Sequence, residues 1–192
     1  MNTKIRAFYA IDLNDEVRNA TRHIIDQLKT NSWQQHVRWT RIENLHLTLR
    51  FLGEVDNTTI ENLNNLLITK LASTKPFNLM LKEPRLFPHF KKPRVIAVGV
   101  SQNEQLIDLA RLLESCAVAV GLAPESRQFK AHLTLGRCDK LFPRRTKLQS
   151  LPFSSKLPVK NITLFHSKLT ERGPIYTPLQ QFPLAKIESL AT

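Results

Sequence analysis

The sequence has few of the residues that build disulfide frameworks and metal centres. It contains two cysteines in 192 residues, Cys116 and Cys138, and their spacing matches neither a zinc site nor a redox pair. Cys116 falls on an expected helix and is predicted to lie in the core. A disulfide-stapled secreted scaffold is therefore excluded, and both thiols are expected to stay reduced.

Long hydrophobic runs are absent as well. No stretch reaches the roughly 18 apolar residues that a membrane-spanning helix needs. Residues 1–13 are apolar only in part, and Asp12 interrupts them, so they do not resemble a signal peptide. We expect a cytoplasmic protein of one domain that does not enter a membrane, and we expect it to be a monomer.

Acidic residues are scarce relative to basic ones. The chain carries 28 Lys and Arg against 16 Asp and Glu, a formal net charge of +12. Such an excess favours a polyanionic partner, and nucleic acid is favoured over a membrane because no long cationic amphipathic helix is present. A soluble basic protein without such a partner is the less favoured alternative on charge alone.

Against this background one short string stands out. HLTL occurs at residues 46–49 and again at residues 132–135, and an arginine follows each copy, Arg50 and Arg137. With six histidines in the chain, two copies of this string are not expected by chance. Both copies lie in extended apolar contexts, which indicates a duplicated strand.

Each motif strand is expected to have a polar face and a leucine face, because side chains alternate along a strand. The polar faces comprise His46, Thr48 and Arg50 in the first copy and Lys130, His132 and Thr134 in the second. The leucines anchor each strand in a core. An unpaired buried imidazole or hydroxyl costs about 1–3 kcal/mol, so the polar faces are expected to line a water-accessible cleft.

Two imidazoles in one cleft suit attack on a phosphodiester. One must be neutral to take a proton from the attacking oxygen, and the other must be protonated to give one to the leaving oxygen. Threonine hydroxyls can hold the non-bridging oxygens together with a cation, for which Arg50 and Lys130 are the candidates. The motif brings no carboxylate or thiolate with it, so we predict neither a metal site nor a cofactor.

The remaining candidates receive weaker predictions. Arg137 lies on the leucine parity of its strand and is expected to face the surface or a loop carboxylate. Trp39 is expected in the core, with base stacking as the lesser alternative. His23 and His36 are expected to be structural. The roles of His89 and His166 stay open.

Hydrophobic periodicity predicts an α+β fold with two pseudo-symmetric lobes, each a mostly antiparallel sheet with helices, around a central cleft. We expect one bilobal domain over residues 1–192, with pseudo-repeats at roughly 1–90 and 91–192. Strands are expected at residues 5–13, 37–40, 45–52, 77–81, 95–100, 129–137 and 159–169. Helices are expected after Asn14, from a capping box at residues 58–61, and at 106–120 before Gly121. Residues 173–184 look turn-rich, and the basic loops 87–94 and 139–147 are candidate rims of a binding surface or ordinary exposed loops.

The sequence resembles the two-histidine (2H) phosphoesterase family, in particular its RNA 2′,3′-cyclic phosphodiesterase branch, also called 2′-5′ RNA ligase-like proteins. The resemblance rests on the paired HLTL strings and on RAFYAIDL, VRWTRIENLHLTLRFLGEV, PRVIAVGV, RQFKAHLTLGR and GPIYTPLQQFPL. These segments follow the family's order and span about residues 6–184, nearly the whole chain. The resemblance implies a bilobal fold and metal-independent hydrolysis of terminal 2′,3′-cyclic phosphates to 2′-phosphates.

The resemblance also implies roles for individual residues. His46 is the expected proton donor and His132 the expected proton acceptor, while Thr48 and Thr134 bind phosphate oxygens. The implied partners are RNA ends or nucleotides, including tRNA. At two positions the chain departs from the family pattern, with Lys130-Ala131 where relatives often have Arg-Pro, and His166 where an acidic residue is common. Lysine keeps the charge but lacks the planar fork of arginine. Reversible 2′-5′ ligation of tRNA halves and RNA-end binding without turnover are the alternative functions.

Overall fold

The computed structural model describes residues 3–88, 93–143, 146–148, 151–171 and 173–185, which form two antiparallel sheets and three α-helices. The first sheet has the strand order β3 (His46–Asp56), β1 (Lys4–Asp12), β8 (Asn161–Thr170) and β9 (Gly173–Pro183). The second sheet has the order β2 (Val37–Trp39), β6 (His132–Cys138), β5 (Val95–Val100), β4 (Phe77–Phe87) and β7 (Ser155–Val159). The predicted α+β class with mostly antiparallel sheets is confirmed.

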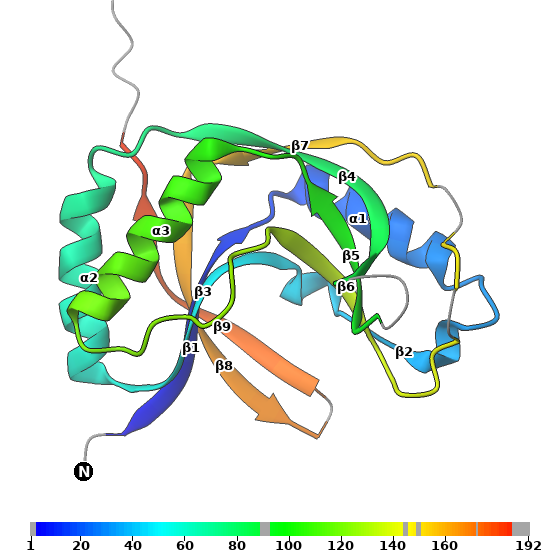
Figure 1. The fold of residues 1–192 in the computed structure, drawn as a ribbon, viewed down its shortest axis with the longest axis horizontal. Helices are drawn as coiled ribbons and strands as arrows, with labels where there is room; N and C mark the ends of the chain where they lie inside the picture. Colours follow the sequence, from blue (N-terminus) through cyan, green and yellow to red (C-terminus); the bar gives the residue numbers. More distant parts are fainter. Residues whose placement is uncertain (1–2, 89–92, 144–145, 149–150, 172, 186–192) are drawn as a thin grey trace, which may run out of the picture.

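Each sheet takes strands from both halves of the chain. In the first sheet, β1 and β3 pair with β8 and β9 from the last part of the sequence, seen as blue and cyan ribbons beside orange ones in Figure 1. The second sheet in turn contains β2 and β4 from the first half. The two sheets therefore do not coincide with the sequence halves 1–90 and 91–192.

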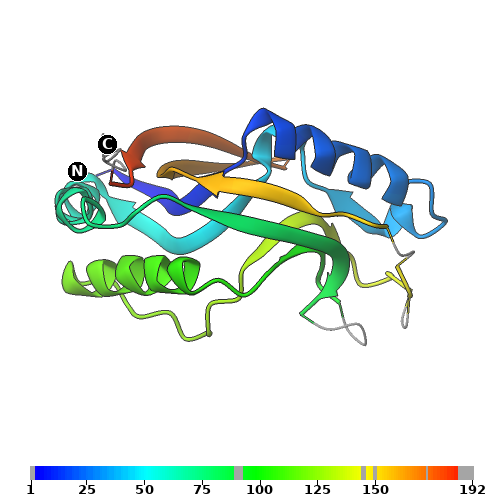
Figure 2. The ribbon, with the colours of Figure 1, turned by 90° about the horizontal axis from the view of Figure 1, so that it is seen from above.

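The helices cover the sheets from two ends. The helices α2 (Asn57–Leu71) and α3 (Glu104–Ala119) lie side by side at one end and both contact β3 (Figures 1 and 2). The helix α1 (Asp15–Leu28) lies away from them and contacts β7 of the second sheet. Their placement leaves the motif faces of β3 and β6 free of helices.

Helix starts follow ordinary capping chemistry, with one correction. Asn14 caps α1 as predicted, its Oδ1 accepting the Val17 N–H at 3.1 Å. The predicted capping box at residues 58–61 is wrong, because Asp56 is the N-cap of α2 and accepts the Thr59 N–H at 2.8 Å. The negative charge of a carboxylate at this position also interacts favourably with the positive end of the helix dipole.

Several strands differ from the prediction: β3 and β4 are longer than expected, and β7 and β9 were not expected. Residues 173–183, expected to be turns, form β9, which tolerates its prolines because it is an edge strand with a free side. The strand β3 continues past Gly53, whose φ of 73° sits where the pairing with β1 shifts register. Glycine adopts this left-handed conformation without a Cβ penalty, so the strand bends there instead of ending.

The core joins both motif strands. All four motif leucines, Leu47, Leu49, Leu133 and Leu135, are buried in one continuous cluster. This confirms that they anchor the two strands, and the burial of Cys116 in the same cluster confirms its predicted place. Within the described part of the chain, no helix has the length and apolar character needed to cross a bilayer.

Candidate active site

His46 begins β3, directly after the short 3-10 helix η2 (Ile42–Asn44) and Leu45. Its Nδ1 lies 2.7 Å from the Asn44 carbonyl oxygen, and its Nε2 lies 3.0 Å from Thr48 Oγ1. A carbonyl oxygen can only accept, so Nδ1 carries a proton and donates it. The second nitrogen, Nε2, is therefore the one that can exchange a proton within the site.

His132 is held in the same way. It is the first residue of β6, and its Nδ1 donates to the Lys130 carbonyl oxygen at 2.7 Å. In both motifs the acceptor is the carbonyl two residues before the histidine. The duplicated string thus fixes the same ring nitrogen in both copies and leaves both Nε2 atoms for chemistry.

Three aromatic rings surround His46. The centroids of Phe8, Tyr176 and Phe165 lie 4.8, 5.1 and 6.2 Å from that of the imidazole. Burial lowers the pKa of His46, and the hydrogen bond to the Asn44 carbonyl and the carboxylate of Asp12 oppose this shift. The carboxylate therefore helps to retain a proton on His46.

His132 lies in a more cationic setting. The ring of Phe87 stacks on its imidazole at 4.4 Å with an interplanar angle of 17°. Burial lowers the pKa of His132 most, the Lys130 carbonyl opposes this, and the charges of Arg137 and Arg85 lower the pKa further. The surroundings of this imidazole favour its neutral form.

The two imidazoles share one electrostatic environment. The strands β3 and β6 contact each other although they belong to different sheets. The charge of His132 acts on the pKa of His46, and Arg137 lowers the pKa of both histidines. The structure therefore brings the two motif strands together at one site.

Both motif strands contain a bulge at the same place. In β3, Thr48 and Arg50 face successive residues of β1, so Leu49 is the extra residue. In β6, Thr134 and Gly136 face successive residues of β5, so Leu135 is the extra residue. A bulge reverses the alternation of side chains beyond it, so the parity argument fails after the second leucine of each motif.

Arg50 shows the effect of the bulge. We predicted that it shares the polar face with His46, and this is wrong, because its side chain is only 6% exposed and points to the α3 side of the sheet. Its Nε lies 2.5 Å from Glu114 Oε2, although the N–H is not aligned for a hydrogen bond. Its terminal nitrogens donate to Glu125 Oε1 at 3.2 Å and to the Ala123 carbonyl at 2.6 Å, and one also donates to the Phe51 carbonyl. The guanidinium is thus engaged by protein acceptors, and its predicted phosphate contact has no support in this geometry.

Arg137 shows the opposite change. Strict alternation along β6 predicts that Arg137 shares the face of the leucines. Because Leu135 is an extra residue, Arg137 instead lies on the face of His132 and Thr134. It is exposed, and its charge reaches both histidines and Tyr176. The sequence offers one signal for this bulge, the isolated glycine Gly136 inside a strand pattern.

The other candidates fall into three groups. Thr48 and Thr134 are half-buried beside their histidines, whereas Lys130 precedes β6 and is exposed. His36 pairs with Asp139 at 3.3 Å, which agrees with a structural role, and Trp39 packs against the core. His89 lies outside the described residues, and so do the centres of the two basic loops, residues 89–92 and 144–145.

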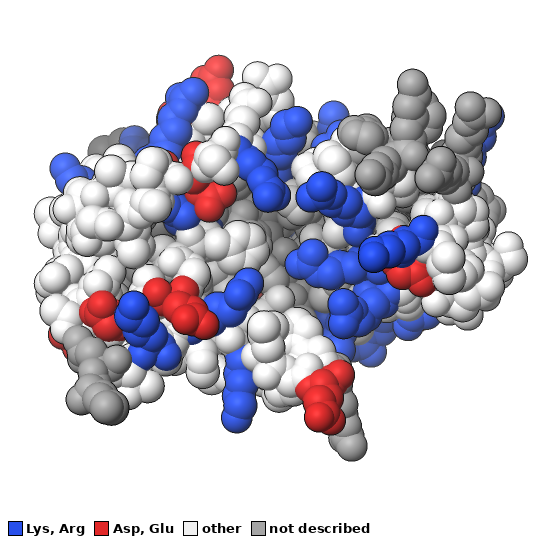
Figure 3. Space-filling model, turned by 60° about the horizontal axis from the view of Figure 1, so that its bottom comes forward, with Lys and Arg blue, Asp and Glu red and all other residues white. Residues whose placement is uncertain are grey.

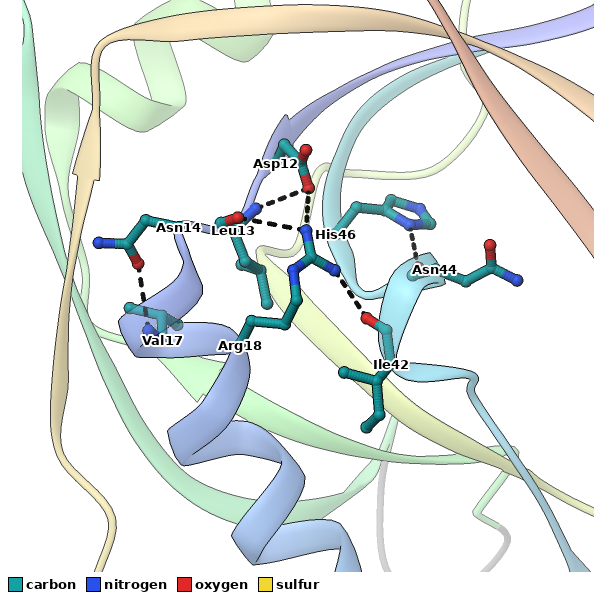
Figure 4. A network of polar contacts seen from close by, with 8 residues as sticks. All are labelled: Asp12, Leu13, Asn14, Val17, Arg18, Ile42, Asn44 and His46. Atoms are coloured by element: carbon teal, nitrogen blue, oxygen red, sulfur yellow. Dashed lines mark hydrogen bonds and ion pairs between the residues drawn. The ribbon is translucent and has the colours of Figure 1, made fainter.

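A polar network supports the position of His46 from behind (Figure 4). Arg18 of α1 donates to Asp12 Oδ1 and to the Ile42 carbonyl, both at 2.7 Å. The Asn44 side chain donates to the Pro174 carbonyl at 2.8 Å while its own carbonyl holds His46. The turn before β3 is thus tied to α1, β1 and β9, which restricts the movement of the imidazole.

Positive charge gathers on one side of the cleft. In Figure 3, Lys and Arg side chains cluster on one side of a central hollow, while acidic and basic side chains are scattered among uncharged ones on the other side. Among the described residues, no group of three or more His, Cys, Asp and Glu side chains is arranged to hold a metal ion. The site as described thus consists of imidazoles, hydroxyls, aromatic rings and arginines.

The chain is similar to known phosphoesterases both in sequence and in structure. The RNA 2′,3′-cyclic phosphodiesterase of Methanothermobacter thermautotrophicus is 35% identical over 187 residues, covering 94% of this chain and 100% of that protein. That of Thermotoga maritima is 31% identical, covering 92% of this chain and 94% of that protein. The crystal structure of E. coli LigT complexed with 3′-AMP has a TM-score of 0.82 at 29% identity, covering 95% of this chain and 99% of that one.

A family model matches the chain twice, and each match contains one HLTL string. The model describes the LigT like Phosphoesterases and matches residues 11–97 and 98–176. The two matches together cover most of the chain, and the apo form of E. coli LigT has the same fold at a TM-score of 0.81 and 30% identity, covering 96% of this chain and 99% of that one. The predicted resemblance is confirmed: the chain belongs to the LigT like Phosphoesterases, a family of two-histidine phosphoesterases.

Proposed function

We propose that this protein hydrolyses the 2′,3′-cyclic phosphate ends of RNA or nucleotides to 2′-phosphomonoesters. The observation that carries the proposal is the matched holding of His46 and His132 by backbone carbonyls, which leaves two Nε2 atoms for one site. Curated relatives across nearly the whole chain are named RNA 2′,3′-cyclic phosphodiesterases, which supports this substrate class.

In the proposed reaction, water attacks phosphorus while His132 takes its proton, and the bond from phosphorus to O3′ breaks. His46 gives a proton to O3′, so a 3′-hydroxyl and a 2′-phosphate result. These roles are the ones that the family resemblance implies. Burial and Arg137 lower the pKa of both histidines, and the two differ in that Asp12 raises the pKa of His46 whereas Arg85 lowers that of His132. The two imidazoles then return to their starting states by exchange with water.

The phosphate is held by the side chains that share the polar face. We assign Thr48 and Thr134 to its non-bridging oxygens, as predicted from the sequence. Arg137 takes the part predicted for Arg50, because the bulge places it on this face and its guanidinium is not engaged by a described carboxylate. A planar guanidinium can donate two hydrogen bonds to a phosphate as negative charge develops.

The test is hydrolysis of an oligonucleotide that ends in a 2′,3′-cyclic phosphate, followed in EDTA to examine the expected metal independence. Each of His46→Ala and His132→Ala is expected to reduce kcat by about 10²–10⁴-fold, and the product is expected to carry its phosphate on O2′. Rates equal to wild type in both variants would overturn the proposal. Saturable binding without ring opening would instead indicate a binding module.

A further inference from the structure

A hollow of about 260 Å³ opens beside His132 on the second sheet. It lies between the ends of β4 and β5, the start of α3 and the segment that precedes β6. None of its described lining residues belongs to the first sheet. Its main chemical groups are Arg85, Phe87, Ser101, Gln102, Phe129 and Lys130.

The hollow borders the proposed active site. Phe87 lines it and also stacks on the imidazole of His132 at 4.4 Å. Lys130 lines it too, and its carbonyl oxygen accepts from His132 Nδ1. A ligand extending from the phosphate site past His132 would therefore enter this space directly.

Arg85 lines the hollow, and its charge lowers the pKa of His132. It projects from β4, and Gly99, the residue of β5 that pairs with His132, leaves room for it. A Cβ added at Gly99 would lie 3.4 Å from Arg85 Nε and 3.5 Å from its Cζ, so the guanidinium rests over the glycine. Two strand spacings separate β4 from β6, roughly 10 Å, and the Arg85 side chain reaches back over Gly99 of the intervening strand β5 toward β6.

The charges of the hollow are uncompensated. Arg85 and Lys130 are both exposed, and within the described part of the chain neither side chain makes a hydrogen bond or ion pair. The arginines Arg18 and Arg50, by contrast, are both engaged by carboxylates. Two adjacent free cations favour an anionic group in the hollow, and a phosphodiester meets that requirement.

The rest of the lining suits a nucleobase. Phe129 is a half-buried aromatic ring on which a base can stack, and the side chains of Ser101 and Gln102 can donate to or accept from its edge. We propose that the hollow binds the nucleotide on the 5′ side of the cyclic end, its phosphodiester on Arg85 and Lys130 and its base against Phe129. This inference rests on the proposed function and extends it to an RNA strand of at least two nucleotides.

Three substrates separate the parts of the hollow. Adenosine 2′,3′-cyclic phosphate has no second phosphate, its 5′-phosphorylated form adds the phosphate, and the dinucleotide ApA with a 2′,3′-cyclic phosphate end adds the base. We expect kcat/KM to rise in this order, by about 10-fold for the phosphate, which matches one charge-assisted hydrogen bond. Arg85→Gln is expected to bring the ratio of kcat/KM between the second and first substrates to about one, whatever its effect on both through His132, while Phe129→Leu removes the gain from the base.

The control is Arg22→Gln, an exposed arginine on α1 outside the hollow, which is expected to leave all three rates unchanged. Dissociation constants of adenosine 2′-phosphate and of the dinucleotide 2′-phosphate, measured by calorimetry, give the same comparison without turnover. Tighter binding of the dinucleotide that Arg85→Gln abolishes supports the hollow even if neither cyclic substrate is hydrolysed. Equal rates and equal affinities for one and two nucleotides, or equal losses on both in Arg85→Gln, would overturn it.

Discussion

His46 and His132 receive the same backbone support and different neighbours. Each donates Nδ1–H to a carbonyl at 2.7 Å, and each is followed by a bulge at the second leucine. Around His46 the neighbours are three aromatic rings and Asp12, whereas His132 has one stacked ring and two arginines. The duplicated strand thus supplies the same backbone geometry twice, while different side chains act on the pKa of each histidine.

The same comparison holds beyond the bulges. Position 50 of β3 and position 136 of β6 both face away from the site, yet one is Arg50 and the other is glycine. The strand β3 is an edge strand, so Arg50 has room to reach Glu114, whereas β2 covers β6 and a Cβ at Gly136 would lie 2.5 Å from Val37 Cγ1. Sheet position, and not the motif itself, decides which side chain fits there.

The largest expected effect breaks the symmetry between the two histidines. On a cyclic phosphate, His46→Ala and His132→Ala should both reduce kcat by about 10²–10⁴-fold. On a nitrophenyl phosphodiester, whose leaving group needs no proton, His46→Ala should approach the wild-type rate while His132→Ala stays impaired. The reverse pattern in kcat for the two substrates would exchange the acid and base roles.

Arg50 and Arg137 sharpen the comparison at the level of stability. Arg50→Gln leaves Glu114 without its buried partner and should lower the free energy of unfolding by about 3 kcal/mol, measured in urea. Because Arg137 is exposed, Arg137→Gln should change the free energy of unfolding by less than about 0.5 kcal/mol. An Arg50→Gln protein of unchanged stability that no longer turns over substrate would restore its predicted phosphate contact.

Arg137 should in turn affect catalysis. Removal of one charged donor to a phosphate oxygen is expected to reduce kcat by about 10²-fold in Arg137→Gln. Because Arg137 lowers the pKa of both His46 and His132, its removal raises both, so the bell-shaped pH profile should move to higher pH on both limbs. A profile that moves on one limb only would show that Arg137 faces a single histidine.

The smallest expected effect concerns Asp12, which raises the pKa of His46 and does not contribute to the shift of His132. In Asp12→Asn the pKa of His46 should fall further, so the alkaline limb moves to lower pH while the acid limb stays in place. The change corresponds to about 0.5 kcal/mol, as for a partly exposed ion pair. Movement of the acid limb of kcat against pH would instead identify His46 as the base.

Much of the site was predictable because the repeated HLTL string identifies both histidines, both threonines and the leucines that anchor them. The error at Arg50 and in the face assigned to Arg137 came from the bulges, because alternation along a strand carries no information about an inserted residue. The surface exposure expected of Arg137 is confirmed. A second error concerned β9, where prolines hid a strand that an edge position tolerates. Asp12 and Arg85 were out of reach, since only the fold brings their strands beside the histidines.

The interleaving of the strands has a consequence for any attempt to divide this protein. A fragment of residues 1–97 would keep His46 but lose β8, the neighbour that completes the first sheet beside β1, while its partner fragment would keep His132 without β2 and β4. Neither fragment contains all the strands of the sheet that carries its histidine, so neither is expected to form its side of the cleft alone.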